Sequence, residues 1–123
     1  MREIKFRGYS KSLQKFIYGG ISIFEDEATI FDVNDMTNSA IEVELDSIGQ
    51  FTGLKDQKGN DIYEGDILEL NNCGLLIVCF YKGEFKLQKL AEYHKKINLY
   101  ASISYLEFSV LRGNIYENPN LLQ

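Results

Sequence analysis

Two cysteines and one histidine are the side chains of this sequence best suited to metal binding or nucleophilic catalysis. Cys73 and Cys79 lack the spacing of a zinc site, and only His94 could join them as a ligand. Any Cys–His or Ser–His–Asp chemistry would also have to use His94, which lies in the charged stretch 92–96. We therefore interpret Cys79 as a core residue, Cys73 as a turn residue and His94 as a surface residue. We predict no catalytic residue and no bound metal.

Residues 51–70, FTGLKDQKGNDIYEGDILEL, place charged side chains and glycines together, as calcium loops and phosphate loops do. An EF-hand counted from Asp56 would need a ligand oxygen at the third position and glycine at the sixth, where this chain has Lys58 and Asp61. The glycine patterns of nucleotide-binding loops are absent as well. We expect no cofactor here. We predict structural turns instead, built by Gly53, Gly59, Gly65 and Asp66.

The charges of the chain are unevenly distributed. Its net charge is −5, and the stretch 16–54 contains eight acids but no lysine or arginine, whereas lysines outnumber acids in residues 82–96. Either segment is a candidate interaction surface, and the plain alternative is that both are solvated faces. The candidate interaction residues are Glu42, Glu44 and Asp46 in the acidic segment and Lys82, Lys86, Lys89, Lys95 and Lys96 in the basic segment.

The apolar pattern predicts strands for much of the chain. Residues 2–8 alternate between apolar and polar, as do residues 41–45, in which Ile41, Val43 and Leu45 are expected to face a core. An outer face of acids is then expected on the second of these strands.

The second half of the chain begins with a stronger strand signal. Residues 75–81, LLIVCFY, form a continuous apolar run that is typical of a strand buried on both faces. Lys82-Gly83 then predicts a two-residue hairpin turn. Residues 86–100 fit a helix only weakly, so helix, strand and loop all stay open there. Alternation of Leu106, Phe108 and Val110 predicts a last strand that ends at Gly113.

Short strands separated by glycine and asparagine turns predict a mainly β protein. We expect a small antiparallel barrel or an SH3-like sheet with at most one short helix. One domain is expected over residues 1–123, divisible into an N-terminal β part (1–50) and an SH3-like β part (51–123). No apolar run approaches the roughly 20 residues that span a bilayer, and the N-terminus lacks the apolar core of a signal peptide. We therefore predict a cytoplasmic protein that does not enter a membrane.

Three segments of the sequence resemble the YopX family, small proteins carried by bacteriophages and prophages. They are the opening REIKFRGYS, the central GQFTGLKDQKGNDIYEGDILEL and the closing RGNIYENPNLL. The opening differs at Gly8-Tyr9-Ser10, where a turn with tryptophan is usual. The resemblance implies a mainly β, barrel-containing fold that assembles into homo-oligomers. It carries no catalytic residue and no cofactor over to this chain.

These observations leave three classes of function open. We predict first a non-enzymatic accessory protein of a phage or prophage that acts through contact with itself and with a host or phage protein. The alternative is a nucleic-acid-associated regulator that uses an SH3-like barrel and the basic residues 82–96, or an acidic mimic of DNA. The negative net charge argues against nucleic acid as a partner. The third class is an enzyme that works through His94 and Asp66.

Overall fold

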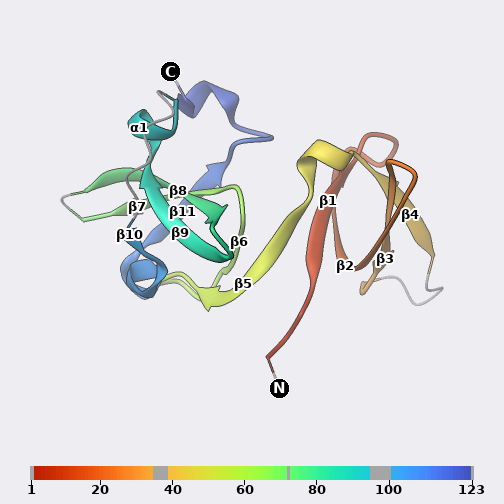
Figure 1. The fold of residues 1–123 in the computed structure, drawn as a ribbon, viewed down its shortest axis with the longest axis horizontal. Helices are drawn as coiled ribbons and strands as arrows, with labels where there is room; N and C mark the ends of the chain where they lie inside the picture. Colours follow the sequence, from red (N-terminus) through yellow and green to blue (C-terminus); the bar gives the residue numbers. More distant parts are fainter. Residues whose placement is uncertain (1, 35–38, 72, 95–100, 123) are drawn as a thin grey trace. The chain divides into compact units, whose positions relative to one another are not determined.

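Strands make up most of the regular structure in the computed structural model, which describes residues 2–34, 39–71, 73–94 and 101–122 (Figure 1). The chain divides into two units, Met1–Phe51 and Thr52–Gln123. The elements are β1 (Phe6–Ser10), β2 (Lys15–Phe24), β3 (Glu27–Asp32), β4 (Ala40–Val43), η1 (Leu45–Ser47), β5 (Gly49–Lys55), β6 (Asp61–Tyr63), β7 (Asp66–Leu70), β8 (Gly74–Tyr81), β9 (Glu84–Lys89), α1 (Leu90–His94), β10 (Ala101–Ser102), η2 (Ile103–Phe108), β11 (Val110–Asn114) and η3 (Pro119–Leu122). The predicted mainly β class is confirmed, although the described strands form two open antiparallel sheets and no closed barrel.

The first unit is built on the antiparallel sheet of order β4-β3-β2-β1-β5-β6, whose last strand lies in the second unit. Strands β2 and β3 form a long hairpin whose pairs run from Gly19 with Asp32 to Phe24 with Glu27. Side chains alternate between the two faces of the sheet, and one face packs the apolar core. The buried residues of this core are Ile17, Ala28, Ile30 and Val43.

The sheet of the first unit curls until β1 and the end of β4 meet. Gly8 permits this approach, because a Cβ at this position would lie only 2.6 Å from Cγ2 of Val43. Tyr9 then joins the two sides: its amide donates to Oγ of Ser47 at 2.8 Å, and its carbonyl accepts from the amide of Glu44 at 2.9 Å. The unit is therefore a curled sheet with its own core.

The short helix η1, which follows β4, corrects the prediction of a strand over residues 41–45. Val43 is buried as expected, but Leu45 is exposed and begins η1. The hydroxyl of Ser47 donates to the carbonyl of Glu44 at 2.6 Å, which bends the chain away from the strand. The alternation was correct up to the residue at which a local hydrogen bond replaced the strand.

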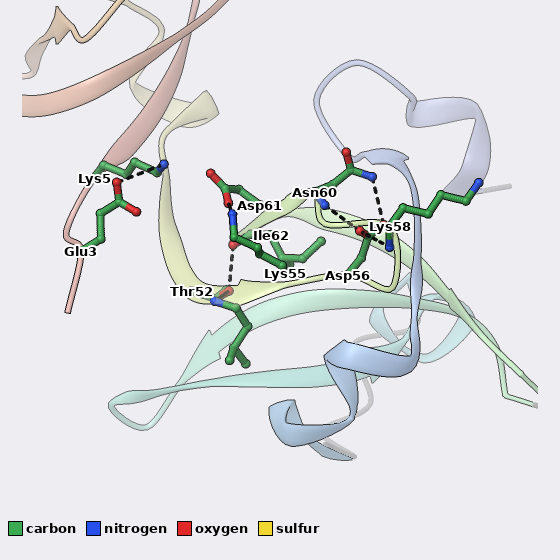
Figure 2. Close-up of polar contacts among 10 residues, drawn as sticks. Glu3, Lys5, Thr52, Lys55, Asp56, Lys58, Asn60, Asp61 and Ile62 are labelled. Carbon is green, nitrogen blue, oxygen red and sulfur yellow. Dashed lines mark hydrogen bonds and ion pairs between the residues drawn. The ribbon is translucent and has the colours of Figure 1, made fainter.

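Strand β5 belongs to both units. Its Gly49 and Gln50 pair with Arg7 and Phe6 of β1 in the first unit. In the second unit the Oγ1 hydroxyl of Thr52 donates to the carbonyl of Ile62 in β6 at 2.8 Å (Figure 2). The boundary between the units thus falls within a strand.

The second unit holds a sheet in the order β10-β9-β8-β7-β11, with apolar residues on both faces. One face packs against β6 and η2, and its buried residues are Ile62, Leu68, Leu76, Val78, Leu87 and Leu106. The other face packs Ile67 and Ile77 against Leu90 of α1, with Leu121 of η3 beside them. Helix α1 also contacts η3, close to the C-terminus (Figure 1). The described part of the closing segment therefore docks on the body of its own unit.

The hairpin predicted at 82–83 is confirmed. Strand β8 pairs with β9 from Leu76 with Lys89 to Tyr81 with Glu84, and both turn residues have positive φ. Burial on both faces of β8 holds for residues 76–78, whereas Phe80 is exposed. Within the segment left open, residues 90–94 form α1, and residues 95–100 lie outside the described residues.

The predicted last strand began too early. Residues 103–108 form the 3-10 helix η2, and only from Val110 does the chain pair with β7. Ser102 caps the start of η2 by accepting from the amide of Ser104, and the Oγ hydroxyl of Ser109 donates to the carbonyl of Leu106 at its end. Leu106 is buried, and it reaches the core from a helical turn.

Candidate functional site

Asp56 anchors the loop between β5 and β6 and is only 5% exposed. Its Oδ1 accepts hydrogen bonds from the amides of Lys58 and Asn60 at 3.0 and 2.8 Å (Figure 2). Its Oδ2 accepts from the side-chain amide of Asn60 at 3.1 Å and from the backbone amide of Leu111 at 2.9 Å. Gly59 completes the loop with a φ of 87°. The segment that resembles a calcium loop is thus a turn built around a carboxylate.

Two opposing effects set the pKa of Asp56. Burial raises it, and the hydrogen bonds from Leu111, Asn60 and Lys58 lower it, with a net pKa below the ordinary value of 3.8. The side chain is therefore ionised at neutral pH and already surrounded by donors. Its role in this arrangement is to hold the loop and β11 in place.

The remaining predicted turn residues lie in the same part of the chain. Gly53 and Gly65 have φ values of 87° and 92°, which side chains rarely adopt. Asp66 is buried, and its Oδ2 accepts from the amide of Tyr63 at 2.8 Å. The amide of Gly65 donates to the carbonyl of Val78 at 2.9 Å, so this turn is fastened to β8.

The basic candidate residues differ in what surrounds them. Nζ of Lys86 lies 2.9 Å from Oε1 of Glu84, an ion pair within β9. Nζ of Lys82 lies 5.4 Å from the ring centre of Tyr81. The other candidates are Lys89, which is exposed, and Lys95 and Lys96, which lie outside the described residues.

The acidic candidate residues lie on β4 and in the turn after it. Glu42 and Asp46 are exposed. Oε1 of Glu44 lies 3.6 Å from Nζ of Lys11, a surface ion pair of small energetic weight. The acidic candidate residues belong to the first unit, and the described basic candidate residues belong to the second. The negative and the positive candidate surfaces therefore lie on different units. His94 ends α1, and its side chain is outside the described part.

The sequence analysis missed one surface, the turn between β2 and β3. We call residues 23–27, IFEDE, the acidic tip. Ile23 and Phe24 are 56% and 72% exposed, and Glu25, Asp26 and Glu27 beside them are exposed too. Apolar residues in a strand are usually part of a core. For this reason the sequence alone does not indicate that Ile23 and Phe24 are exposed. The available signal was the run of three acids directly after the pair.

The backbone of the acidic tip is under local strain. Glu25 and Asp26 have φ values of 49° and 66°, the left-handed conformation that two-residue hairpin turns require and that asparagine and glycine adopt more readily. The paired change Glu25→Asn with Asp26→Gly is therefore expected to raise the free energy of unfolding by about 1 kcal/mol in urea titrations. Glu42→Gln removes an exposed acid without touching a turn and is the control. An unchanged or lowered stability of the paired variant would contradict the assignment of strain.

A second exposed turn lies between β8 and β9. We call residues 80–86, FYKGEFK, the basic tip. Phe80 is 52% exposed, and its ring meets that of Phe85 edge to face at a centroid distance of 5.1 Å. Lys82 lies between these two phenylalanines in the sequence, and Lys86, which pairs with Glu84, follows Phe85. The basic tip thus combines aromatic surface with positive charge.

Cys79 shares the α1 face of the second sheet with polar neighbours. Its Sγ lies 3.6 Å from Oε1 of the buried Gln88, and burial together with the charge of Glu64 raises the pKa of the thiol to about 11. Burial, Cys79 and Glu64 raise the pKa of Tyr93 as well. A raised thiol pKa leaves little thiolate at neutral pH, so this sulfur is a poor nucleophile.

The two cysteines are therefore expected to differ in reactivity. At mildly alkaline pH the Cys79 thiol should react with iodoacetamide roughly a hundredfold more slowly than an ordinary thiol, because the thiolate is the reacting form. Cys73 is exposed and should react first. Peptide mass spectrometry measures both rates, and the variants Cys73→Ser and Cys79→Ser isolate each thiol. Equal rates in the two variants would refute the expectation.

The described residues contain neither a cluster of metal-binding side chains nor a helix that could span a membrane. Within residues 2–34, 39–71, 73–94 and 101–122, no group of three or more His, Cys, Asp or Glu side chains lies close enough together to hold a metal ion. In the same part of the chain no helix has the length and apolar character needed to cross a membrane.

Comparison with known proteins places the chain in a family. The sequence profile described as YopX protein matches residues 5–123. The chain belongs to the YopX family. A crystal structure of protein EF1440 from Enterococcus faecalis has a similar fold, with a TM-score of 0.60 and 24% identity over 100% of both chains. No curated protein matches the sequence significantly.

In the closing segment that resembles the YopX family, RGNIYENPNLL, asparagine side chains accept hydrogen bonds from nearby backbone amides. Oδ1 of Asn114 accepts from the amides of Tyr116 and Glu117 at 3.0 and 2.8 Å, and Oδ1 of Asn118 accepts from the amide of Asn114 at 3.1 Å. A Cβ at Gly113 would lie 2.4 Å from Oδ1 of Asn118. The asparagines and the glycine of this segment thus form a compact turn and are scaffold.

Proposed function

We propose that this chain is a non-enzymatic accessory protein of a phage or prophage. It acts through protein–protein contact in the cytoplasm of a bacterial host, and the acidic tip is the contacting element. The observation that carries the proposal is the exposure of Ile23 and Phe24 next to three acids. Membership of the YopX family is consistent with this role and adds no catalytic residue.

The composition of the acidic tip supports a contact surface. Protein interfaces typically have a small apolar centre, rich in aromatic residues, within a polar rim. Phe24 provides such a centre, on the face of β2 that it shares with its paired residue Glu27, and Glu25, Asp26 and Glu27 provide the rim. Burying one such aromatic side chain contributes about 1.5–3 kcal/mol. Because the stretch 16–54 has no lysine or arginine, a complementary partner surface is positively charged.

The nucleic-acid alternative has less support. Lys86 is paired with Glu84, and the described basic candidates beyond it are Lys82 and Lys89. Affinity for nucleic acid grows with the number of phosphates that free cations neutralise. A chain of net charge −5 also repels phosphate at a distance.

A pair of matched variants tests the proposal. Phe24→Asp places a charge in the acidic tip, and Phe108→Asp does the same at a phenylalanine in η2 that is 61% exposed. The immobilised chain is incubated with host lysate, retained proteins are identified by mass spectrometry, and binding of each purified protein is titrated. Phe24→Asp should weaken binding of the true partner at least tenfold, about the loss expected for a central aromatic residue, whereas Phe108→Asp should not. The proposal fails if no retained protein depends on Phe24 and the chain sediments as a monomer at every concentration.

A further inference from the structure

We infer that the first unit binds an extended segment of another protein through two of that segment's arginines. The inference rests on the proposed function, because it keeps Phe24 as a contacting residue and adds the rest of the surface and the chemistry of the partner. The surface is one face of β2, β3 and β4, which carries Phe24, Phe31, Glu27 and Glu42 and which we call the outer face. Each of its two rings has a carboxylate nearby, so the outer face offers two sites for a cation.

The strand register places these four side chains together. Phe24 of β2 pairs with Glu27 of β3, and side chains directly opposite each other lie on the same face. Phe31 follows four residues after Glu27 along β3, on the same side of the strand. Glu42 of β4 pairs with Thr29, the residue midway between them. The intervening positions 28 and 30 of β3 are buried in the core, so the four side chains lie on the side away from it.

The two sites are accessible. Phe24 is 72% and Phe31 50% exposed, and Glu27 and Glu42 are exposed as well. A Cβ at Gly20, which pairs with Phe31, would meet nothing within 4 Å, so the space beside that ring is open. No lysine or arginine in residues 2–34, 39–71, 73–94 and 101–122 forms an ion pair with Glu27 or Glu42. Both sites are therefore open to a cation from another molecule.

An arginine side chain suits an aromatic ring that has a carboxylate nearby. The guanidinium group is planar, so it can stack on the ring with its face while its edge donates hydrogen bonds to the carboxylate. A lysine ammonium is more strongly hydrated and cannot stack in this way. The first unit already contains such a contact, in which the guanidinium carbon of Arg7 lies 4.7 Å from the ring centre of Phe16. The outer face is therefore expected to prefer arginine to lysine.

The distance between the two sites sets the spacing of the two arginines. The pair of Phe24 with Glu27 and the pair of Gly20 with Phe31 are four register steps apart, which corresponds to about 13 Å along the strands. In an extended peptide, side chains four residues apart point the same way and are separated by about the same length. Adjacent side chains point to opposite sides, so only one of two adjacent arginines could reach the outer face. The expected segment carries its arginines four residues apart.

Two blocked synthetic peptides of identical composition and charge test the inference. In GRTVTRG the arginines are four residues apart, and in GRRTVTG they are adjacent. In NMR titrations at low ionic strength, GRTVTRG should bind the wild-type chain with a dissociation constant on the order of 1 mM, and added salt should weaken the binding. GRRTVTG should bind at least threefold more weakly, and so should the peptide GKTVTKG, in which lysine replaces both arginines.

Variants of the chain assign the binding to the outer face. Phe31→Ala with Glu42→Gln removes the site that lies outside the acidic tip and should weaken binding of GRTVTRG about fivefold. Phe24→Ala, at the other site, should have an effect of similar size. Glu107→Gln with Phe108→Ala removes the same kinds of exposed group from η2 and should leave binding unchanged. Circular dichroism of each variant confirms folding.

The inference fails if the folded wild-type chain does not bind GRTVTRG, or if it binds GRRTVTG or GKTVTKG as tightly. It also fails if Phe31→Ala with Glu42→Gln binds GRTVTRG as the wild type does. If a host protein requires Phe24 but neither Phe31 nor Glu42, the inference fails and the proposed function stands. If GRTVTRG binds as expected but no retained host protein depends on Phe24 and the chain is monomeric, the two cation sites are supported and the proposed function fails.

Discussion

Replacing Gly19 with alanine is expected to lower the free energy of unfolding by about 3 kcal/mol or more. A Cβ at this position would lie 1.8 Å from the carbonyl oxygen of Phe31 in β3, and the φ of Gly19 is 157°. The oxygen belongs to the backbone, so it cannot rotate away as a side chain would. Strands β2 and β3 would have to separate where they carry the core of the first unit.

The next residue provides the control for this prediction. A Cβ at Gly20 would meet nothing within 4 Å. Gly20→Ala should therefore change stability by less than about 1 kcal/mol, and it should stabilise if alanine restricts the unfolded chain. Urea titration followed by circular dichroism measures both variants. Similar losses in the two would show that β2 and β3 are not held at the distance described.

Asp56→Asn is expected to cost about 2–4 kcal/mol of stability at neutral pH. The carboxylate accepts four hydrogen bonds in a buried position, two at each oxygen. An amide group replaces one of these oxygens with a donor, which would face other donors. The amide of Leu111 or those of Lys58 and Asn60 would then lose their acceptor.

The pH dependence separates this effect from a simple packing defect. The pKa of Asp56 is lowered in the folded chain, so its contribution is complete above the unfolded value of 3.8 and disappears as the pH falls through the lower folded value. The stability difference between the wild type and Asp56→Asn should therefore shrink in acid below that value. Glu69→Gln, at an exposed pair with Arg112, should cost under about 1 kcal/mol at neutral pH. A difference that is constant with pH would contradict the assigned role of the carboxylate.

Local patterns in the sequence were sufficient where local physics determines the structure. The hairpin at Lys82-Gly83 could be predicted because glycine adopts positive φ and the flanking residues alternate. The last strand was misplaced because Leu106 and Phe108 alternate as in a strand, while the serines that cap η2 decide the conformation. Hydrogen bonds between residues far apart in the sequence could not be predicted. Nothing near Asp56 in the sequence indicates that the amide of Leu111 donates to it.

The candidate interaction surfaces, too, could be predicted from local sequence patterns only in part. The uneven charge of the chain was visible, and it pointed to the acidic segment as a contact surface. The acids chosen from it, Glu42, Glu44 and Asp46, were those of a clearly alternating strand. Ile23 and Phe24 were not chosen, because only coordinates show that an apolar pair at a strand end is exposed. Exposure depends on what the rest of the chain covers, and a local pattern does not contain it.

The hydrogen bond from Leu111 to Asp56 has a consequence for the order in which the chain folds during synthesis. The bond joins residues 55 positions apart, so the loop at Asp56 is completed only after β11 has been made. The contacts of the first unit, by contrast, lie within residues 1–51. At roughly 5–20 residues per second, the ribosome needs several more seconds to reach β11. The β2–β3 pairs that shape the acidic tip lie within residues 19–32, so all of them are synthesised before the residue that completes the loop at Asp56.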